Sequence, residues 1–276
     1  MRMLLFAASA LTLLTAAQAP ITAAPVAAAE RAFAKDGAAM GVGPSFIKWS
    51  TDDAVVIGGG GVGKAHVEFA GPPPAGPQPV LAWWPLFAGI AQSGDLGFTT
   101  GPVEVGGKRQ GHYFTVWKKQ ADGGWKWIYD GGAGATAVGE APASVEPIYL
   151  PIATVKPMAP AKAMQAATAA EAALAAKARG NVGEAFQAAL GETSRVYVAP
   201  QPPAVGVAAA VAALKAYPAS MEFSAPAGGE SSKAGDLVYV YGQVKGQGVA
   251  GWYVHLWQRR TDGMKLVFAQ IVPVRG

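Results

Sequence analysis

Carboxylates and histidines beside strand-like segments are the residues of this chain best suited to proton chemistry. Asp53 lies at the start of a short apolar segment, Asp130 ends another, Glu104 lies in a third, and His112 is the histidine candidate. A carboxylate acts as a general base when its surroundings bring its pKa near the working pH. These residues do not make up a complete catalytic set, so we expect a binding or structural role before an enzymatic one.

Two predicted strands, residues 111–120 and 251–259, carry aromatic and polar side chains on one face, because every second residue of a strand shares a face. The residues of that face are Tyr113, Thr115 and Trp117 in the first strand and Tyr253, His255 and Trp257 in the second. A polar centre flanked by aromatic residues is typical of a ligand-lining surface, whereas core packing explains the rings equally well. The candidate pocket residues are therefore Tyr113, Thr115, Tyr253 and His255.

The chain's three histidines do not form a metal-ligand set. His112 and His255 lie at non-equivalent positions of similar segments, and His66 has no identifiable partner, whereas a metal site needs several ligands. Cysteine is absent, which excludes cysteine-ligated metals, a disulfide framework and a lipoprotein anchor. We expect neither a metal nor a cofactor.

A glycine-rich segment, residues 58–64 (Gly-Gly-Gly-Gly-Val-Gly-Lys), partly fits a phosphate-binding loop. The following residue is Ala65, so the hydroxyl that would bind magnesium is missing. About 20 residues further on, where a dinucleotide-binding domain has an acidic residue, the chain has Trp83. We therefore expect a glycine loop that binds no nucleotide.

An internal repeat dominates the organisation of the chain. Gly-Asp-Leu at 94–96 recurs at 235–237, and the pattern from Gly111 to Gly123, with its Tyr, Trp and Asp, recurs from Gly251 to Gly263. Upstream, Ala29-Glu30 matches Ala170-Glu171 at a spacing of 141 residues. The spacing falls by one residue at two later loops, so two copies of one domain follow each other.

Composition and the N-terminus indicate an exported protein. Residues 1–19 combine Arg2, an apolar stretch and an Ala-x-Ala site, which is typical of a cleaved signal peptide. We therefore expect a periplasmic or secreted location without a membrane anchor. The net charge of +4 comes from scattered Lys and Arg, so nucleic acid is not an expected partner.

Each copy is predicted to place helices before strands, the order of an α+β domain. In copy one, residues 27–40 and 63–69 read as helices and 54–57, 81–90, 96–105, 111–120 and 125–130 as strands. In copy two, 161–178, 186–190 and 207–216 read as helices and 196–198, 221–224, 237–244, 251–259 and 264–274 as strands. The predicted domains span 26–132 and 161–276, joined by a linker at 133–160 that is rich in Gly, Ala and Pro.

This order, with the segments 29–33, 52–55, 93–97, 111–117 and 122–126, resembles the nuclear transport factor 2-like (NTF2-like) superfamily. The nearest branch is the SnoaL-like domains of exported bacterial proteins. The resemblance implies two tandem cone-shaped domains, each with N-terminal helices packed on a curved antiparallel sheet. Because related domains dimerise through their sheets, it also implies an internal pseudo-dimer.

The resemblance implies two kinds of function. The first is binding of a small apolar or amphipathic molecule, or a scaffold role in the envelope. The alternative is an isomerase, cyclase or hydrolase that uses an acid of the first domain. A carboxylate deep in a pocket beside a Tyr or His would favour the enzyme, and a pocket without an acid would favour binding.

Overall fold

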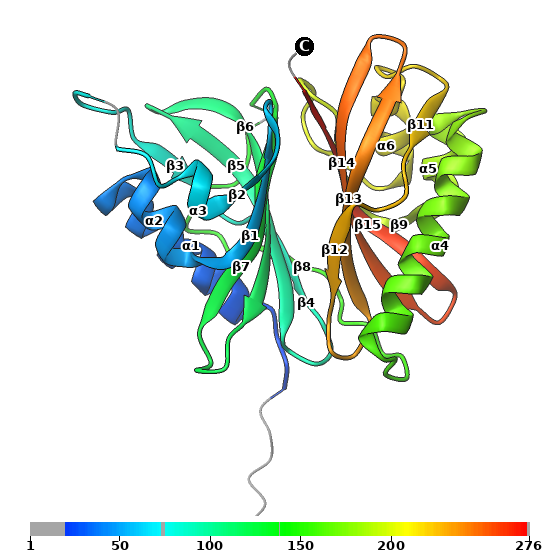
Figure 1. Ribbon diagram of the computed structural model, residues 1–276, viewed down its shortest axis with the longest axis horizontal. Helices are drawn as coiled ribbons and strands as arrows, with labels where there is room; N and C mark the ends of the chain where they lie inside the picture. Colours follow the sequence, from blue (N-terminus) through cyan, green and yellow to red (C-terminus); the bar gives the residue numbers. More distant parts are fainter. Residues whose placement is uncertain (1–19, 73–74, 138, 275–276) are drawn as a thin grey trace, which may run out of the picture.

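The computed structural model describes residues 20–72, 75–137 and 139–274, which form two halves with the same order of elements (Figure 1). Helices come first in each half and long strands follow. The predicted signal segment, residues 1–19, lies outside the described residues. Within the described ranges, no helix is long and apolar enough to cross a membrane.

The first half has three helices and seven strands, followed by a short strand between the halves. In chain order they are α1 (Ala24–Met40), α2 (Val42–Trp49), β1 (Ser50–Gly58), β2 (Gly61–Lys64), α3 (Ala65–Glu68), β3 (Leu81–Trp83), β4 (Phe87–Ile90), β5 (Leu96–Val105), β6 (Lys108–Lys119), β7 (Trp125–Gly134) and β8 (Ile148–Tyr149). The second half repeats the order. Its elements are α4 (Pro160–Ala178), α5 (Val182–Ala189), β9 (Leu190–Tyr197), β10 (Ala204–Val205), α6 (Val207–Leu214), β11 (Met221–Phe223), β12 (Gly228–Ser231), β13 (Leu237–Gly246), β14 (Val249–Arg260) and β15 (Gly263–Pro273).

Each half contains one sheet. The first has the order β2-β1-β7-β6-β5-β4-β8, with β3 also paired to β5. The second has the order β10-β9-β15-β14-β13-β11, with β12 also paired to β13. The long central strands are antiparallel, whereas β1 runs parallel to β7 and β9 runs parallel to β15. The predicted α+β class, with helices ahead of a sheet in each half, is confirmed.

The two sheets pack face to face, and the helices cover their outer faces (Figure 1). Strand residues of both halves form one apolar cluster between the sheets. At its centre, the rings of Phe114 and Phe268 stack with centroids 3.7 Å apart and planes inclined by 6°. Tyr129 accepts a hydrogen bond from Gln270 of the second half at 2.9 Å. Burial of this apolar area favours a fixed arrangement of the halves.

Each half also has its own core, which lies between its sheet and its helices. Trp117 and Trp257, on the same face of equivalent strands, are the largest side chains that face these cores from β6 and β14, and both are buried. The alternation predicted from sequence is therefore present: Phe114 and Val116 face the other sheet, whereas Tyr113 and Trp117 face the helices.

Backbone geometry explains several of the glycines that recur at equivalent positions of the two halves. A Cβ atom on Gly111 would come within 2.2 Å of the carbonyl oxygen of Ala133, and one on Gly251 within 2.3 Å of that of Val272. At the predicted hairpin turns, Gly123 and Gly263 have φ angles of 87° and 112°, which glycine adopts at low energy.

Some elements differ from their predicted bounds. The predicted helix at 63–69 is divided between strand β2 and the single turn α3. The segment predicted as linker contributes the end of β7 and strand β8, which pairs with β4. Strands β10 and β12 were not predicted, because short segments gain strand structure only from the neighbours with which they pair.

Candidate functional site

A cavity of about 280 Å³ lies between the helices and the sheet of the first half. Helices α1 and α2 contribute Phe33 and Phe46, and strands β3 and β5 contribute apolar side chains. The full lining is Phe33, Phe46, Leu81, Trp83, Val103, Gln110, Gly111, His112, Tyr113 and residues 130–134. One carboxylate, Asp130, therefore stands in a wall that is otherwise mostly apolar.

Asp130 is half-buried on β7, directly opposite Thr115 of β6. The Thr115 hydroxyl donates a hydrogen bond of 2.7 Å to its carboxylate. Burial raises the pKa of Asp130 to about 8; the Thr115 hydrogen bond opposes this change, and the charge of Glu30 adds to it. Near neutral pH, Asp130 is therefore mostly protonated and can donate a hydrogen bond or exchange a proton.

Tyr113, one of the candidate pocket residues, lines the same cavity. Its side chain is buried, and its hydroxyl has no well-aligned hydrogen-bond partner among the described residues. Burial, together with the charges of Glu30 and Asp130, raises its pKa well above the ordinary value. Its phenol therefore stays neutral near neutral pH. Thr115 contributes indirectly, since it holds Asp130.

Behind this wall lies Glu30, a carboxylate of α1 that is fully buried. It accepts hydrogen bonds from the indole N–H of Trp83 at 2.6 Å, from that of Trp117 at 3.0 Å and from the Thr99 hydroxyl. Burial raises the pKa of Glu30 to about 7, against the effect of these donors. Glu30 was not predicted as a site residue, although the matched pair Glu30 and Glu171 was a signal that could have identified it.

The second half has the same framework without an equivalent site. Glu171, on α4, binds the His255 ring at 2.9 Å and the indole N–H of Trp257 at 2.5 Å. His255 is fully buried and packed among the rings of Phe186, Phe223 and Tyr253. The two candidate pocket residues of this half, Tyr253 and His255, thus lie in its packed core.

The strand registers explain why the two halves differ. Thr115 faces Asp130 across the first pair of strands, whereas His255 faces Ala269 across the second. Tyr113 faces Gly132, whereas Tyr253 faces Ile271, whose side chain is buried in the core. The first half thus has an acid and a bare glycine where the second has an alanine and a bulky aliphatic residue.

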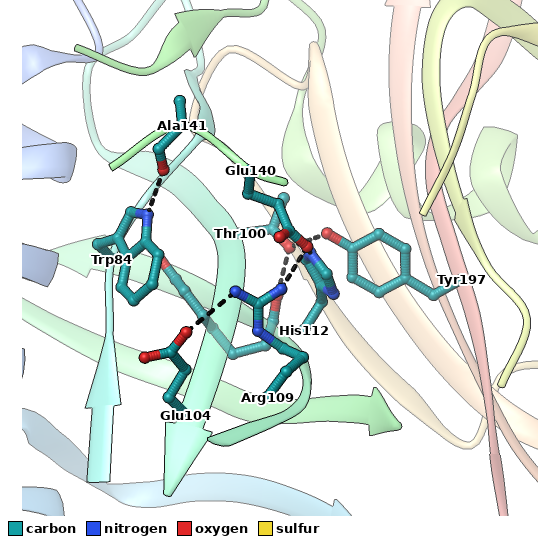
Figure 2. A network of polar contacts seen from close by, with 9 residues as sticks. Trp84, Thr100, Glu104, Arg109, His112, Glu140, Ala141 and Tyr197 are labelled. Carbon is teal, nitrogen blue, oxygen red and sulfur yellow. Dashed lines mark hydrogen bonds and ion pairs between the residues drawn. The ribbon is translucent and has the colours of Figure 1, made fainter. Parts of the chain in front are cut away.

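His112 borders the cavity, but its side chain belongs to a polar network at the junction of the halves (Figure 2). Its Nε2 lies 3.3 Å from Glu140, which also binds Arg109. Its ring packs on Tyr197 of the second half, whose hydroxyl lies 2.5 Å from that of Thr100. Burial lowers the pKa of His112 to about 4. The ring is therefore neutral near pH 7 and joins the two halves.

Asp53, the other acidic candidate, is exposed on β1 and does not line the cavity. Its backbone carbonyl accepts a hydrogen bond from Lys64 at 2.9 Å.

The glycine segment forms the β1–β2 hairpin, where Gly58 pairs with Gly61, so Lys64 ends a strand instead of starting a phosphate-binding helix. Glu104 pairs with Arg109 at 3.3 Å. Among the described residues, no group of three or more His, Asp or Glu is placed to hold a metal ion.

A scan against protein-family models gives no match, and neither does a search of curated proteins. Solved structures similar to this chain include a cystatin-like fold protein from Burkholderia xenovorans LB400, which is 19% identical, covers 42% of this chain and 94% of its own, and has a TM-score of 0.35. A ketosteroid isomerase-like protein from Erwinia carotovora atroseptica SCRI1043 is 14% identical over 41% of this chain and 97% of its own, with a TM-score of 0.35.

A third similar structure, a putative scytalone dehydratase from Novosphingobium aromaticivorans DSM 12444, is 16% identical, with a TM-score of 0.34. It covers 41% of this chain and 84% of its own. A putative dehydratase from the NTF2-like family of Streptomyces avermitilis is 15% identical over 42% of this chain and 99% of its own, with a TM-score of 0.34. Each of these structures covers less than half of this chain. Because fold does not fix chemistry, they do not define a reaction for this chain.

Proposed function

We propose that the first half binds a small, mostly apolar molecule that carries a hydrogen-bonding oxygen. The difference between the halves carries this proposal: Asp130 and Gly132 occupy the positions that Ala269 and Ile271 take in the second half. Shared packing accounts for the residues that the two halves have in common. It gives no reason for an acid in the cavity wall of the first half where the second half has Ala269.

The lining suggests the class of ligand. Phe33, Phe46 and Trp83 offer apolar ring surfaces, while Tyr113 and protonated Asp130 offer hydrogen-bond donors. A volume of 280 Å³ is near the lower end of ligand pockets, which hold about 300–1,000 Å³. We infer a neutral ligand of one or two rings with a carbonyl or hydroxyl oxygen.

Binding is tested with 2-naphthol, a neutral two-ring phenol, by following the quenching of tryptophan fluorescence in the full chain. We expect saturable binding, since Trp83 lines the cavity. Asp130→Leu should weaken it by about tenfold, the effect of one lost hydrogen bond to a buried group, and Asp53→Leu at the exposed site should not. Unsaturable binding, or equal affinity in the two variants, would contradict the proposal and favour a scaffold role.

A second candidate function is proton transfer on the bound molecule, as in an isomerase, cyclase or hydrolase. The observation that favours it is a carboxyl with a pKa of about 8 in the same cavity as the buried Tyr113 hydroxyl. Such a carboxyl exchanges protons near neutral pH. Exchange of deuterium from solvent into the α-carbon of a cyclic ketone such as 2-tetralone, abolished in Asp130→Asn, tests it.

We also propose that the chain is exported and that residues 1–19 are removed, on the sequence pattern alone. Mass spectrometry of the protein recovered from the periplasm or medium gives the test. A mature chain that begins near residue 20 is expected, and an intact Met1 in a cytoplasmic fraction would contradict it.

A further inference from the structure

The two halves surround the same buried carboxylate with different partners. Both keep a glutamate on the first helix, Glu30 or Glu171, and both bind it with an indole N–H, from Trp117 or Trp257. In the second half, the His255 ring lies 2.9 Å from Glu171, and both side chains are at most 1% exposed. A buried carboxylate needs a hydrogen-bonding partner, and the His255 ring supplies one.

The first half has no basic side chain beside Glu30 in the part of the chain described. Its partners there are the neutral donors of Trp83, Thr99 and Trp117. At the position of His255 stands Thr115, and the group beyond Thr115 is a second acid, Asp130. Two carboxylates in a buried site without a cation repel each other, so one of them retains a proton.

Thr115 connects these two acids. Its hydroxyl lies 2.7 Å from Asp130, and across the sheet it faces Thr99, whose hydroxyl donates to Glu30. The nearness of Thr115 to Glu30 also lowers the pKa of that carboxyl. A hydroxyl has one hydrogen and two acceptor sites. It can therefore donate to Glu30 while it accepts from a protonated Asp130, or donate to Asp130 when that group is ionised.

We propose that Glu30 is a positioning residue that keeps the shared proton on Asp130 through the Thr115 hydroxyl. The proton resides on Asp130 because Glu30 accepts three further hydrogen bonds that stabilise its ionised form. When Asp130 gives up its proton, that proton passes to Thr115 while the Thr115 hydrogen passes to Glu30, so the pair keeps one negative charge.

The surroundings of Asp130 support this assignment. The titratable groups that act on it are Glu30 from α1, Tyr113 from β6 and the adjacent Tyr129 of β7. Both tyrosines are neutral at neutral pH, since burial raises their pKa values well above the ordinary value. Glu30 is thus the charge that adds to the effect of burial on Asp130.

This inference deepens the proposed function, because a protonated Asp130 is the donor assigned there to the ligand oxygen. Its test needs no ligand. The full chain is labelled with ¹³C at the carboxyl groups of Asp and Glu, and the signals are followed by NMR as the pH is raised. The signals of Asp130 and Glu30 are identified by their loss in Asp130→Asn and Glu30→Gln.

In the wild-type protein, we expect the Asp130 and Glu30 signals each to report both titration steps, as coupled groups do. Glu30→Gln should lower the titration midpoint of Asp130 by about one pH unit or more, since a neighbouring charge has an effect of that size. Glu171→Gln, the matched change in the second half, should leave it unchanged. An unchanged midpoint in Glu30→Gln would overturn the proposal.

Glu30→Gln removes a buried hydrogen-bond acceptor, so a second variant is needed in case it does not fold. Thr115→Val keeps the shape of the side chain and both acids but removes the connecting hydroxyl. The two charges still repel each other in this variant, so the coupling should weaken without vanishing, and each carboxyl should report mainly its own step. Independent titration of the two groups already in the wild-type protein would overturn the proposal, whatever 2-naphthol binding shows.

Discussion

At the residue scale, equivalent strand positions have acquired different roles in the two halves. Thr115 and His255 occupy the same place, yet Thr115 binds an acid of the cavity wall and His255 binds a buried glutamate. Both were predicted to line a pocket, because each is a polar residue between aromatic residues on one face of its strand. The nearby helix decides the outcome, and its distance from the strand could not be inferred from the sequence of the strand.

We predict that His255→Val destabilises the protein by about 3 kcal/mol, because it removes a hydrogen bond from the buried carboxyl group of Glu171. Thr115→Val removes one hydrogen bond from a half-buried acid and should cost about 1 kcal/mol. Urea denaturation followed by circular dichroism measures both, with Val67→Ala at a residue that is 74% exposed as the control. Equal losses in the two variants would contradict these roles.

The raised pKa of Asp130 also predicts how the stability of the protein changes with pH. An unfolded chain releases this proton near pH 4, whereas the folded protein holds it up to about pH 8. Between these values the unfolded state binds fewer protons, so the free energy of unfolding falls as the pH rises. Glu30, with its pKa raised to about 7, acts in the same direction.

We therefore predict that Asp130→Asn is more stable relative to the wild type at about pH 8.5 than at about pH 5, since asparagine does not ionise. Denaturation at both pH values measures the difference. Asp53→Asn, at an exposed acid, is the matched control and should show no such change. A larger stability advantage of Asp130→Asn at pH 5 than at pH 8.5 would contradict this prediction.

At the element scale, the long strands could be predicted and the short ones could not. Alternation over eight or more residues gave β5, β6, β13 and β14 close to their bounds. The end of β7, residues 131–134, was not predicted as strand: the predicted strand ended at residue 130 and the predicted linker began at 133, since glycine is rare in strands. It forms strand nevertheless, since β6 runs beside it along its whole length.

This glycine-rich end of β7 leads to a prediction about the cavity. A Cβ atom on Gly134 would meet nothing closer than the Gln110 carbonyl oxygen at 3.7 Å, so the backbone does not require glycine there. Gly134 lies on the same strand face as Asp130 and Gly132. We infer that the missing side chain keeps the cavity open.

Gly134→Val should therefore weaken 2-naphthol binding by about tenfold while it changes stability by about 0.5 kcal/mol or less, as surface substitutions do. Fluorescence titration and urea denaturation measure the two effects. Ala137→Val, a change of similar size at an exposed residue outside the cavity, is the control. Wild-type affinity in Gly134→Val would place the ligand elsewhere.

At the scale of the whole molecule, the repeat predicted two related halves but not the contacts that join them. The carboxylate of Asp95 accepts from the backbone N–H of Lys233 at 3.1 Å, and that of Asp236 accepts from the backbone N–H of Gln92 at 2.9 Å. Each bond is the counterpart of the other, as in a two-fold interface. From sequence, the two aspartates indicated only a turn, because a turn is a local pattern. The backbone N–H groups that bind the aspartates lie in the other half of the chain and could not be inferred from that pattern.

This symmetric contact, together with the apolar face that each sheet presents to the other, argues that neither half is stable by itself. Expressed separately, residues 20–140 would expose Phe114 and Tyr129, and residues 161–276 would expose Tyr239 and Phe268. Apolar patches of that kind cause association or aggregation. We predict that the isolated halves aggregate or bind each other when mixed, and that the full chain unfolds in one transition. Size-exclusion chromatography and calorimetry measure this. Two stable monomers without mutual affinity would show that the halves are independent domains.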